Sequence, residues 1–255
     1  MDGESALHIS ARKIEILLAT LLIKRNETVS TDQIVGEVWG EHPPNRVRAS
    51  LHVYISKLRK LLQARGGPDS RIVTRSSGYS LLVGSDELDV CEFEQKVAQG
   101  KARTAAGQHE EAIVAFEAAL ALVRDPVLSD VGDGVILSSF AKWVEEVRLE
   151  TIELMVTSHL ALGRNRELVG LLSTVIVTYP LHEEFYWQLM LALHRCGRRA
   201  DALKVYQSAR ETLQRELGLE PCRALRDLQY SILAADGEEP RWGLRGVSAQ
   251  LLTAR

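Results

Sequence analysis

The sequence lacks the features that mark several protein classes. It has no run of about 18 apolar residues, so no transmembrane helix is expected. The first four residues, MDGE, lack the basic and then apolar segments of a signal peptide. Three cysteines, Cys91, Cys196 and Cys222, stand far apart without a C-x-x-C pair, which indicates reduced thiols. We therefore expect a cytoplasmic protein with no membrane partner.

Motifs for common enzyme chemistry are also missing. The chain has neither G-x-x-x-x-G-K-[ST] nor G-x-G-x-x-G, and neither G-x-S-x-G nor H-x-x-x-H. His182-Glu183-Glu184 lacks the second histidine of a zinc protease, and a solvated helix start explains it. We therefore expect no enzyme, no catalytic residue, no cofactor and no metal site.

The net charge of −3 conceals an uneven distribution. Composition is ordinary for a globular protein, with 45% hydrophobic and 25% charged residues. Residues 1–84 carry 12 basic and 8 acidic side chains, whereas the remainder carries 19 and 26. Residues 46–75 alone hold eight bases and one acid. This asymmetry is expected when one module meets a polyanion and the other does not.

The first 84 residues predict three helices and a hairpin. After a short strand over 6–9, apolar spacing predicts a helix over 11–25. A capping box at Ser30 and Gln33 starts a second helix, which Gly40 ends. A third helix, capped by Asn45, precedes strands over 72–74 and 79–83. The order is that of a winged helix-turn-helix.

The third helix has two unlike faces. Its inward stripe is Leu51, Ile55, Leu58 and Leu62. The opposite face is small in its middle and basic at its rim, with Arg46, Ala49, Val53, Ser56, Lys57 and Lys60, and Ser50 beside them. Small residues let a helix approach the major groove, while long cations reach phosphates or guanine. A merely solvated basic face is the alternative interpretation.

Residues 88–235 contain a helical repeat. Three glycines, Gly107, Gly163 and Gly197, align, and the positions five, nine and twelve residues after each are apolar. The last two glycines are 34 residues apart, the tetratricopeptide period, and the first two are 56 apart, which places an insertion within 125–138. The alternative is a helical bundle without a repeat. Residues 236–255 are expected to form a flexible tail.

Several of these motifs, in this order, resemble a known family. The segments over 30–40, 51–62 and 72–79, with Pro43-Pro44 after Trp39-Gly40, resemble the OmpR-type DNA-binding domain. The two prolines, the segment Leu88 to Phe93 and the repeats resemble the Streptomyces antibiotic regulatory protein (SARP) family, whose helical part is the bacterial transcriptional activation domain. The expected fold is mainly α, with a winged helix-turn-helix domain over 5–84 and a tetratricopeptide-like all-α domain over 88–235.

The resemblance also implies roles for individual residues. The residues expected to face bases are Ser50, His52, Val53 and Lys57. The residues expected to hold phosphates are Arg46, Arg48, Tyr54, Arg59, Lys60 and Trp39, although Trp39 equally suits a core position. Arg75, Ser76 and Ser77 form the wing, where Arg75 enters a minor groove, and Tyr79 belongs to the hairpin core.

The function that the resemblance implies is transcription activation. Members of the family are expected to bind promoter direct repeats as a head-to-tail homodimer, to recruit RNA polymerase holoenzyme and to control a secondary-metabolite gene cluster. A second class of function stays open, because only about five residues precede Ala6, where the family has a longer sheet. It is a repeat-based interaction or sensor protein whose truncated winged domain no longer binds DNA.

Overall fold

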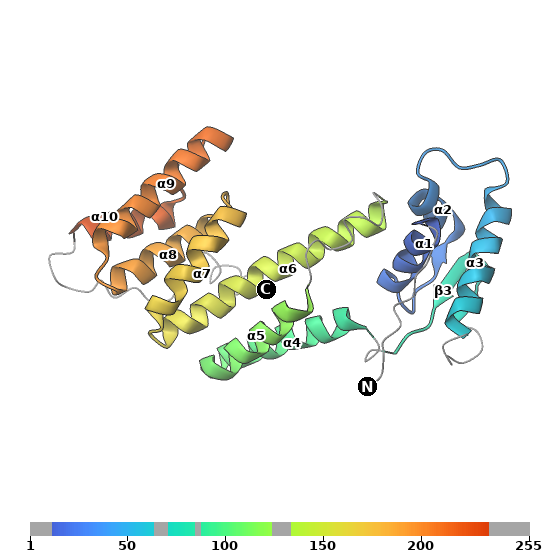
Figure 1. Cartoon of the computed structure of the whole chain (residues 1–255), viewed down its shortest axis with the longest axis horizontal. Helices are drawn as coiled ribbons and strands as arrows, with labels where there is room; N and C mark the ends of the chain where they lie inside the picture. Colours follow the sequence, from blue (N-terminus) through green and yellow to red (C-terminus); the bar gives the residue numbers. More distant parts are fainter. Residues whose placement is uncertain (1–11, 64–70, 85–87, 124–133, 235–255) are drawn as a thin grey trace. The chain divides into compact units, whose positions relative to one another are not determined.

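The computed structural model describes residues 12–63, 71–84, 88–123 and 134–234 (Figure 1). The chain forms two compact units. The first unit comprises Met1–Phe93 and Ala121–Arg148, and the second comprises Glu94–Leu120 and Leu149–Arg255. The predicted strand over 6–9 and the tail over 236–255 lie outside the described residues. None of the described helices combines the length and apolarity needed to cross a bilayer.

Three helices of the first unit form where the sequence predicts them. They are α1 (Arg12–Ile23), α2 (Thr31–Trp39) and α3 (Val47–Gln63). The capping box is confirmed, because Ser30 Oγ accepts from the Gln33 N–H and Gln33 Oε1 accepts from the Ser30 N–H. Gly40 ends α2 at a φ of 60°. Asn45 lies in the turn before α3.

The sheet of the first unit contains one strand more than the predicted hairpin. Strands β2 (Ile72–Thr74) and β3 (Gly78–Leu81) pair antiparallel and confirm the hairpin. On its other edge, β3 pairs with β1 (Val29–Ser30), so the order is β1-β3-β2. Because β1 is only two residues long, it has no alternating pattern from which it could be predicted.

The core of the first unit joins the helices to this sheet. Leu17 and Leu21 of α1, Ile34 of α2 and Leu51 of α3 are almost completely buried, and Ile72 of β2 packs with them. Burial of this apolar face fixes α3 against its supporting helices and leaves the opposite face of α3 in solvent.

The remaining helices alternate with tight turns. They are α4 (Asp89–Ala105), α5 (His109–Leu122), α6 (Val135–Ala161), α7 (Asn165–Thr178), α8 (Glu183–Arg195), α9 (Arg199–Leu217) and α10 (Arg223–Ala234). Gly107, Gly163 and Gly197 lie between α4 and α5, α6 and α7, and α8 and α9, at φ values of 73°, 72° and 75°. A left-handed conformation favours glycine, which explains the repeated residue. The predicted helical hairpins and the mainly α fold class are confirmed.

The repeat positions form the contacts within these hairpins. All nine apolar residues that follow the three glycines are buried: Ala112, Phe116 and Ala119, then Leu168, Leu172 and Val175, then Ala202, Tyr206 and Ala209. The middle hairpin accommodates larger residues than the other two at its first and third positions.

Helix α6 begins within the segment predicted to hold the insertion. Residues 124–133 lie outside the described residues, and Val135 already belongs to α6. The start of α6 contacts α2. Glu37, 8% exposed, accepts hydrogen bonds from the backbone N–H groups of Ile136 at 2.7 Å and Leu137 at 3.3 Å. A carboxylate at this position stabilises the start of a helix by capping its N–H groups and by favourable interaction with the helix dipole.

Two helix-interior glycines of the second unit give a matched test of packing. A Cβ on Gly100 of α4 would lie 2.3 Å from the ring of the buried Phe116, whereas a Cβ on Gly170 of α7 meets nothing within 4 Å. Gly100→Ala is expected to lower the free energy of unfolding by about 1–3 kcal/mol through overpacking. Gly170→Ala is expected to raise it by about 0.5–1 kcal/mol, the usual gain for alanine over glycine in a helix. Chemical denaturation measures both changes, and equal effects would contradict the close approach of α4 and α5.

Candidate nucleic-acid interface

Helix α3 presents one face to solvent. Leu51, Ile55 and Leu58 are each 1% exposed, which confirms the predicted inward stripe, and Leu62 is half-buried. Exposed on the opposite face are Ala49, Val53, Ser56, Lys57 and Lys60, with His52 exposed and Ser50 half-buried at its edges. Arg46, just before α3, and Arg48, in its first turn, are also exposed. The structure therefore brings the residues predicted to face bases to the solvent side of one helix.

The wing lies at the turn between β2 and β3. Arg75, Ser76 and Ser77 are exposed, and the turn is closed by the Arg75 N–H, which donates to the Gly78 carbonyl at 2.8 Å. The Ser77 carbonyl accepts from the Thr31 N–H at 3.1 Å, which ties the turn to the first residue of α2. Tyr79 is 4% exposed, so its predicted core position is confirmed.

Arg59 connects α3 to the wing. Its Nε and Nη2 donate to the Ile72 carbonyl at 3.1 and 2.9 Å, and Nη2 also donates to Thr74 Oγ1 at 2.8 Å. Sequence reasoning missed this contact, since the residue was expected to hold a phosphate. Bonds from two guanidinium nitrogens to β2 give Arg59 a positioning role, because they fix the strand that leads into the wing.

His52 makes a second connection of this kind. Its Nδ1 lies 3.0 Å from the Tyr79 hydroxyl, and the two rings meet edge-on at 6.3 Å. The side chain thus bridges α3 and β3 while part of it stays exposed. Together, Arg59 and His52 connect α3 to both strands that flank the wing.

An aromatic pair borders the face. Trp39 and Tyr54, both half-buried, stack with ring centroids 5.6 Å apart and planes 8° apart. Lys13 of α1 places its Nζ 5.3 Å from the centroid of the Trp39 ring, within the range of a cation–π contact. This cation is exposed and was missed by sequence reasoning, because nothing in the spacing of α1 relates Lys13 to Trp39.

Two family models match the chain in order. The model for "Transcriptional regulatory protein, C terminal" matches residues 4–81, and that for "Bacterial transcriptional activator domain" matches residues 88–233. The chain is 34% identical over 241 residues to the regulatory protein DnrI of Streptomyces peucetius, a match that covers 92% of this chain and 88% of DnrI. The chain belongs to the SARP family of transcriptional regulators.

Two further relatives show how widely the SARP arrangement is shared. The transcriptional regulator RedD of Streptomyces coelicolor is 35% identical, over 89% of this chain and 66% of RedD. A solved structure of EmbR from Mycobacterium tuberculosis, in complex with a low-affinity phosphopeptide, is 33% identical with a TM-score of 0.83. That match covers 88% of this chain but only 59% of EmbR. The winged helix-turn-helix followed by helical hairpins is therefore the fold of this SARP chain.

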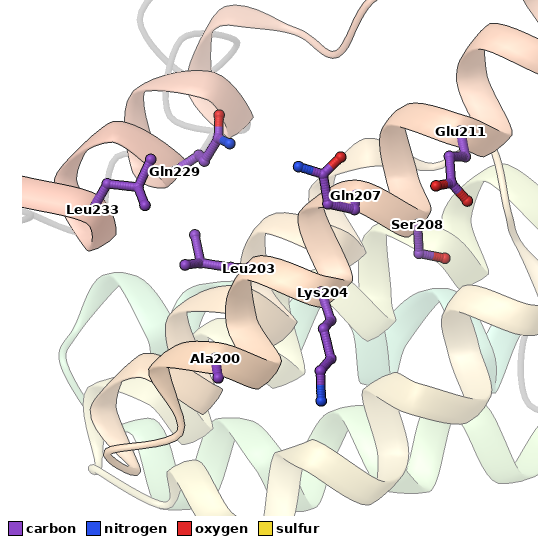
Figure 2. Close-up of a pocket in the computed structure, with 8 residues that line it drawn as sticks. All are labelled: Ala200, Leu203, Lys204, Gln207, Ser208, Glu211, Gln229 and Leu233. Carbon is purple, nitrogen blue, oxygen red and sulfur yellow. The ribbon is translucent and has the colours of Figure 1, made fainter.

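The second unit of this SARP chain contains an open groove between α9 and α10. Figure 2 shows Ala200, Leu203 and Gln207 on α9 beside Gln229 and Leu233 on α10. Its cation Lys204 pairs with Asp201 at 3.3 Å. Among the described residues, no group of three or more His, Cys, Asp or Glu side chains could hold a metal ion.

The segment His182-Glu183-Glu184 has structural partners instead. His182 forms a short hydrogen bond with Glu153, and Glu183 Oε2 accepts from the Cys222 N–H at 2.6 Å. These bonds connect the start of α8 to α6 and to the residues before α10. The prediction of a solvated helix start is therefore wrong, because all three residues of the segment are half-buried.

Proposed function

We propose that the chain is a sequence-specific DNA-binding transcription activator. In this proposal residues 5–84 bind promoter DNA, and residues 88–235 contact RNA polymerase holoenzyme. The regulated genes form a secondary-metabolite cluster, as the name of the Streptomyces antibiotic regulatory protein family suggests. The site of action is the nucleoid.

The exposed face of α3 is the observation that carries the proposal. It combines small residues in its middle with Arg46, Lys57 and Lys60 at its rim, on a helix whose other side is buried in the core. Small residues at its centre let the backbone of a helix approach the major groove, and cations at its edge can then reach phosphates or guanine. Arg75 on the wing suits the narrow and more negative minor groove next to it.

The second unit suits a contact with another protein. Stacked helical hairpins present extended surfaces that are commonly used for binding proteins. Binding as a head-to-tail homodimer would place two copies of α3 on successive direct repeats, about one helical turn apart on the same face of the DNA. Footprinting of promoter DNA would test this spacing.

Two lysines distinguish base contacts from phosphate contacts. Lys57→Ala is expected to weaken binding to the preferred site by about 1–3 kcal/mol and to relax sequence preference, because Lys57 faces bases. Lys60→Ala is expected to weaken binding to all DNA about equally and to reduce the salt slope by about one unit, because Lys60 faces phosphate. Mobility-shift titrations over a range of salt measure both effects, with Lys142→Ala, an exposed lysine of α6, as control. Identical behaviour of the two variants would contradict the assignment of Lys57 to bases and Lys60 to phosphate.

The salt titration also tests the proposal as a whole. A protein that makes about six phosphate contacts gives a slope of log K against log salt near −5. The probe is DNA from the region upstream of the neighbouring genes. Retention that does not change with salt concentration would contradict DNA binding. It would favour a repeat-based interaction or sensor protein instead.

A further inference from the structure

The middle of the exposed face of α3 is apolar. Val53 is 52% exposed, and Ala49, one turn earlier, is also exposed. The face is otherwise polar or basic, with Ser56, Lys57 and Lys60 following along the helix. An isolated exposed valine needs no explanation in a protein. Here, however, it lies at the centre of the face that the proposed function places against the bases.

Valine is suited to one feature of the major groove. Its side chain neither donates nor accepts a hydrogen bond, so it would leave the polar edge of guanine, cytosine or adenine unsatisfied. The C5-methyl group of thymine is the apolar feature of the groove edge. Contact between methyl groups removes apolar surface of both partners from water, and it needs no hydrogen bond from valine to the thymine O4 beside the methyl group.

We propose that Val53, with Ala49 beside it, recognises the methyl group of a thymine. Each bound half-site then contains a T·A pair opposite the middle of α3, in addition to the base contacts of Lys57. This inference rests on the proposed function, because it requires α3 to lie in the major groove. It identifies Val53 as a residue that determines specificity.

Replacement of thymine by uracil tests the contact, because uracil lacks only the methyl group. The probe is a duplex recovered with the full chain from a random-sequence library, prepared once with thymine and once with uracil throughout. Loss of one buried methyl group is expected to weaken binding of the unmodified protein about fourfold for each half-site. Val53→Ala is expected to bind the thymine duplex more weakly than the unmodified protein does. It should also discriminate less than twofold between the two duplexes, because it lacks the side-chain methyl groups that contact the thymine methyl group.

A matched variant separates this contact from changes in DNA shape. Val177 of α7 is 77% exposed and lies in the second unit, so Val177→Ala removes the same atoms from a helix outside the proposed interface. It should keep the full preference for thymine. Because both valines are exposed, neither change is expected to disturb folding.

The outcomes separate the two proposals. If the unmodified protein binds both duplexes equally, DNA binding stands but recognition of thymine is overturned. If Val53→Ala keeps the full preference for thymine, another residue makes the contact and the assignment of Val53 is overturned. If the library yields no bound duplex even at low salt, the proposed function itself is overturned, and this inference with it.

Discussion

Gly78→Ala is expected to lower the free energy of unfolding of the first unit by about 3 kcal/mol or more and to abolish DNA binding. A Cβ on Gly78 would lie 1.9 Å from the Val29 carbonyl oxygen and 2.9 Å from the Ser30 Cα. Both are backbone atoms of β1, so relief requires separation of β1 from β3. Because Ser30 of β1 caps α2, this separation would also move α2 relative to the wing.

Gly36→Ala is the matched control for this change. Gly36 lies exposed in α2, and a Cβ there meets nothing within 4 Å. Alanine should stabilise the helix by about 0.5–1 kcal/mol. Denaturation curves give the two stabilities, and mobility shifts give DNA binding. A Gly78→Ala protein with unchanged stability would refute the close packing of β1 on β3.

Glu37→Ala is expected to cost about 1.5–3 kcal/mol and to release the first turn of α6. The substitution removes the acceptor for the Ile136 and Leu137 N–H groups, which then lose a charged partner in a largely buried position. Hydrogen–deuterium exchange should therefore increase over residues 135–140. This local readout is needed because the chain contains two units, whose unfolding transitions can overlap.

Two further variants control the Glu37 experiment. Glu41→Ala removes an exposed carboxylate just after α2 and should leave exchange in α6 unchanged. Gly134→Ala should reproduce the effect from the other side, since its Cβ would lie 2.0 Å from Glu37 Oε2. Unaltered protection of α6 in both Glu37→Ala and Gly134→Ala would show that the cap does not hold this helix.

Elements with local signals were predictable from the sequence. The capping box of Ser30 and Gln33 and the terminal Gly40 define α2 within one stretch of chain. The stripe of α3 follows from helical periodicity, and the three repeat glycines follow from the positive φ that each turn requires. In each case, residues close in sequence determine the local conformation.

Contacts between distant residues were not predictable in this way. The family resemblance assigned Arg59 to phosphate, yet its three hydrogen bonds go to β2. Lys13 joins Trp39 only when α1 packs beside α2. The start of α6 was not located from the sequence, because Glu37, which caps it, lies 99 residues before Ile136 in the chain.

The sequence by itself determined the helices, the hairpin, the repeat and the placing of the basic residues on one side of α3. It did so because periodicity, caps and turn glycines act over a few residues. Only the tertiary structure decided which of these cations remain exposed, how the wing is fixed to α3 and where α6 begins. Those outcomes depend on hydrogen bonds and close packing between segments that meet only after the chain has folded.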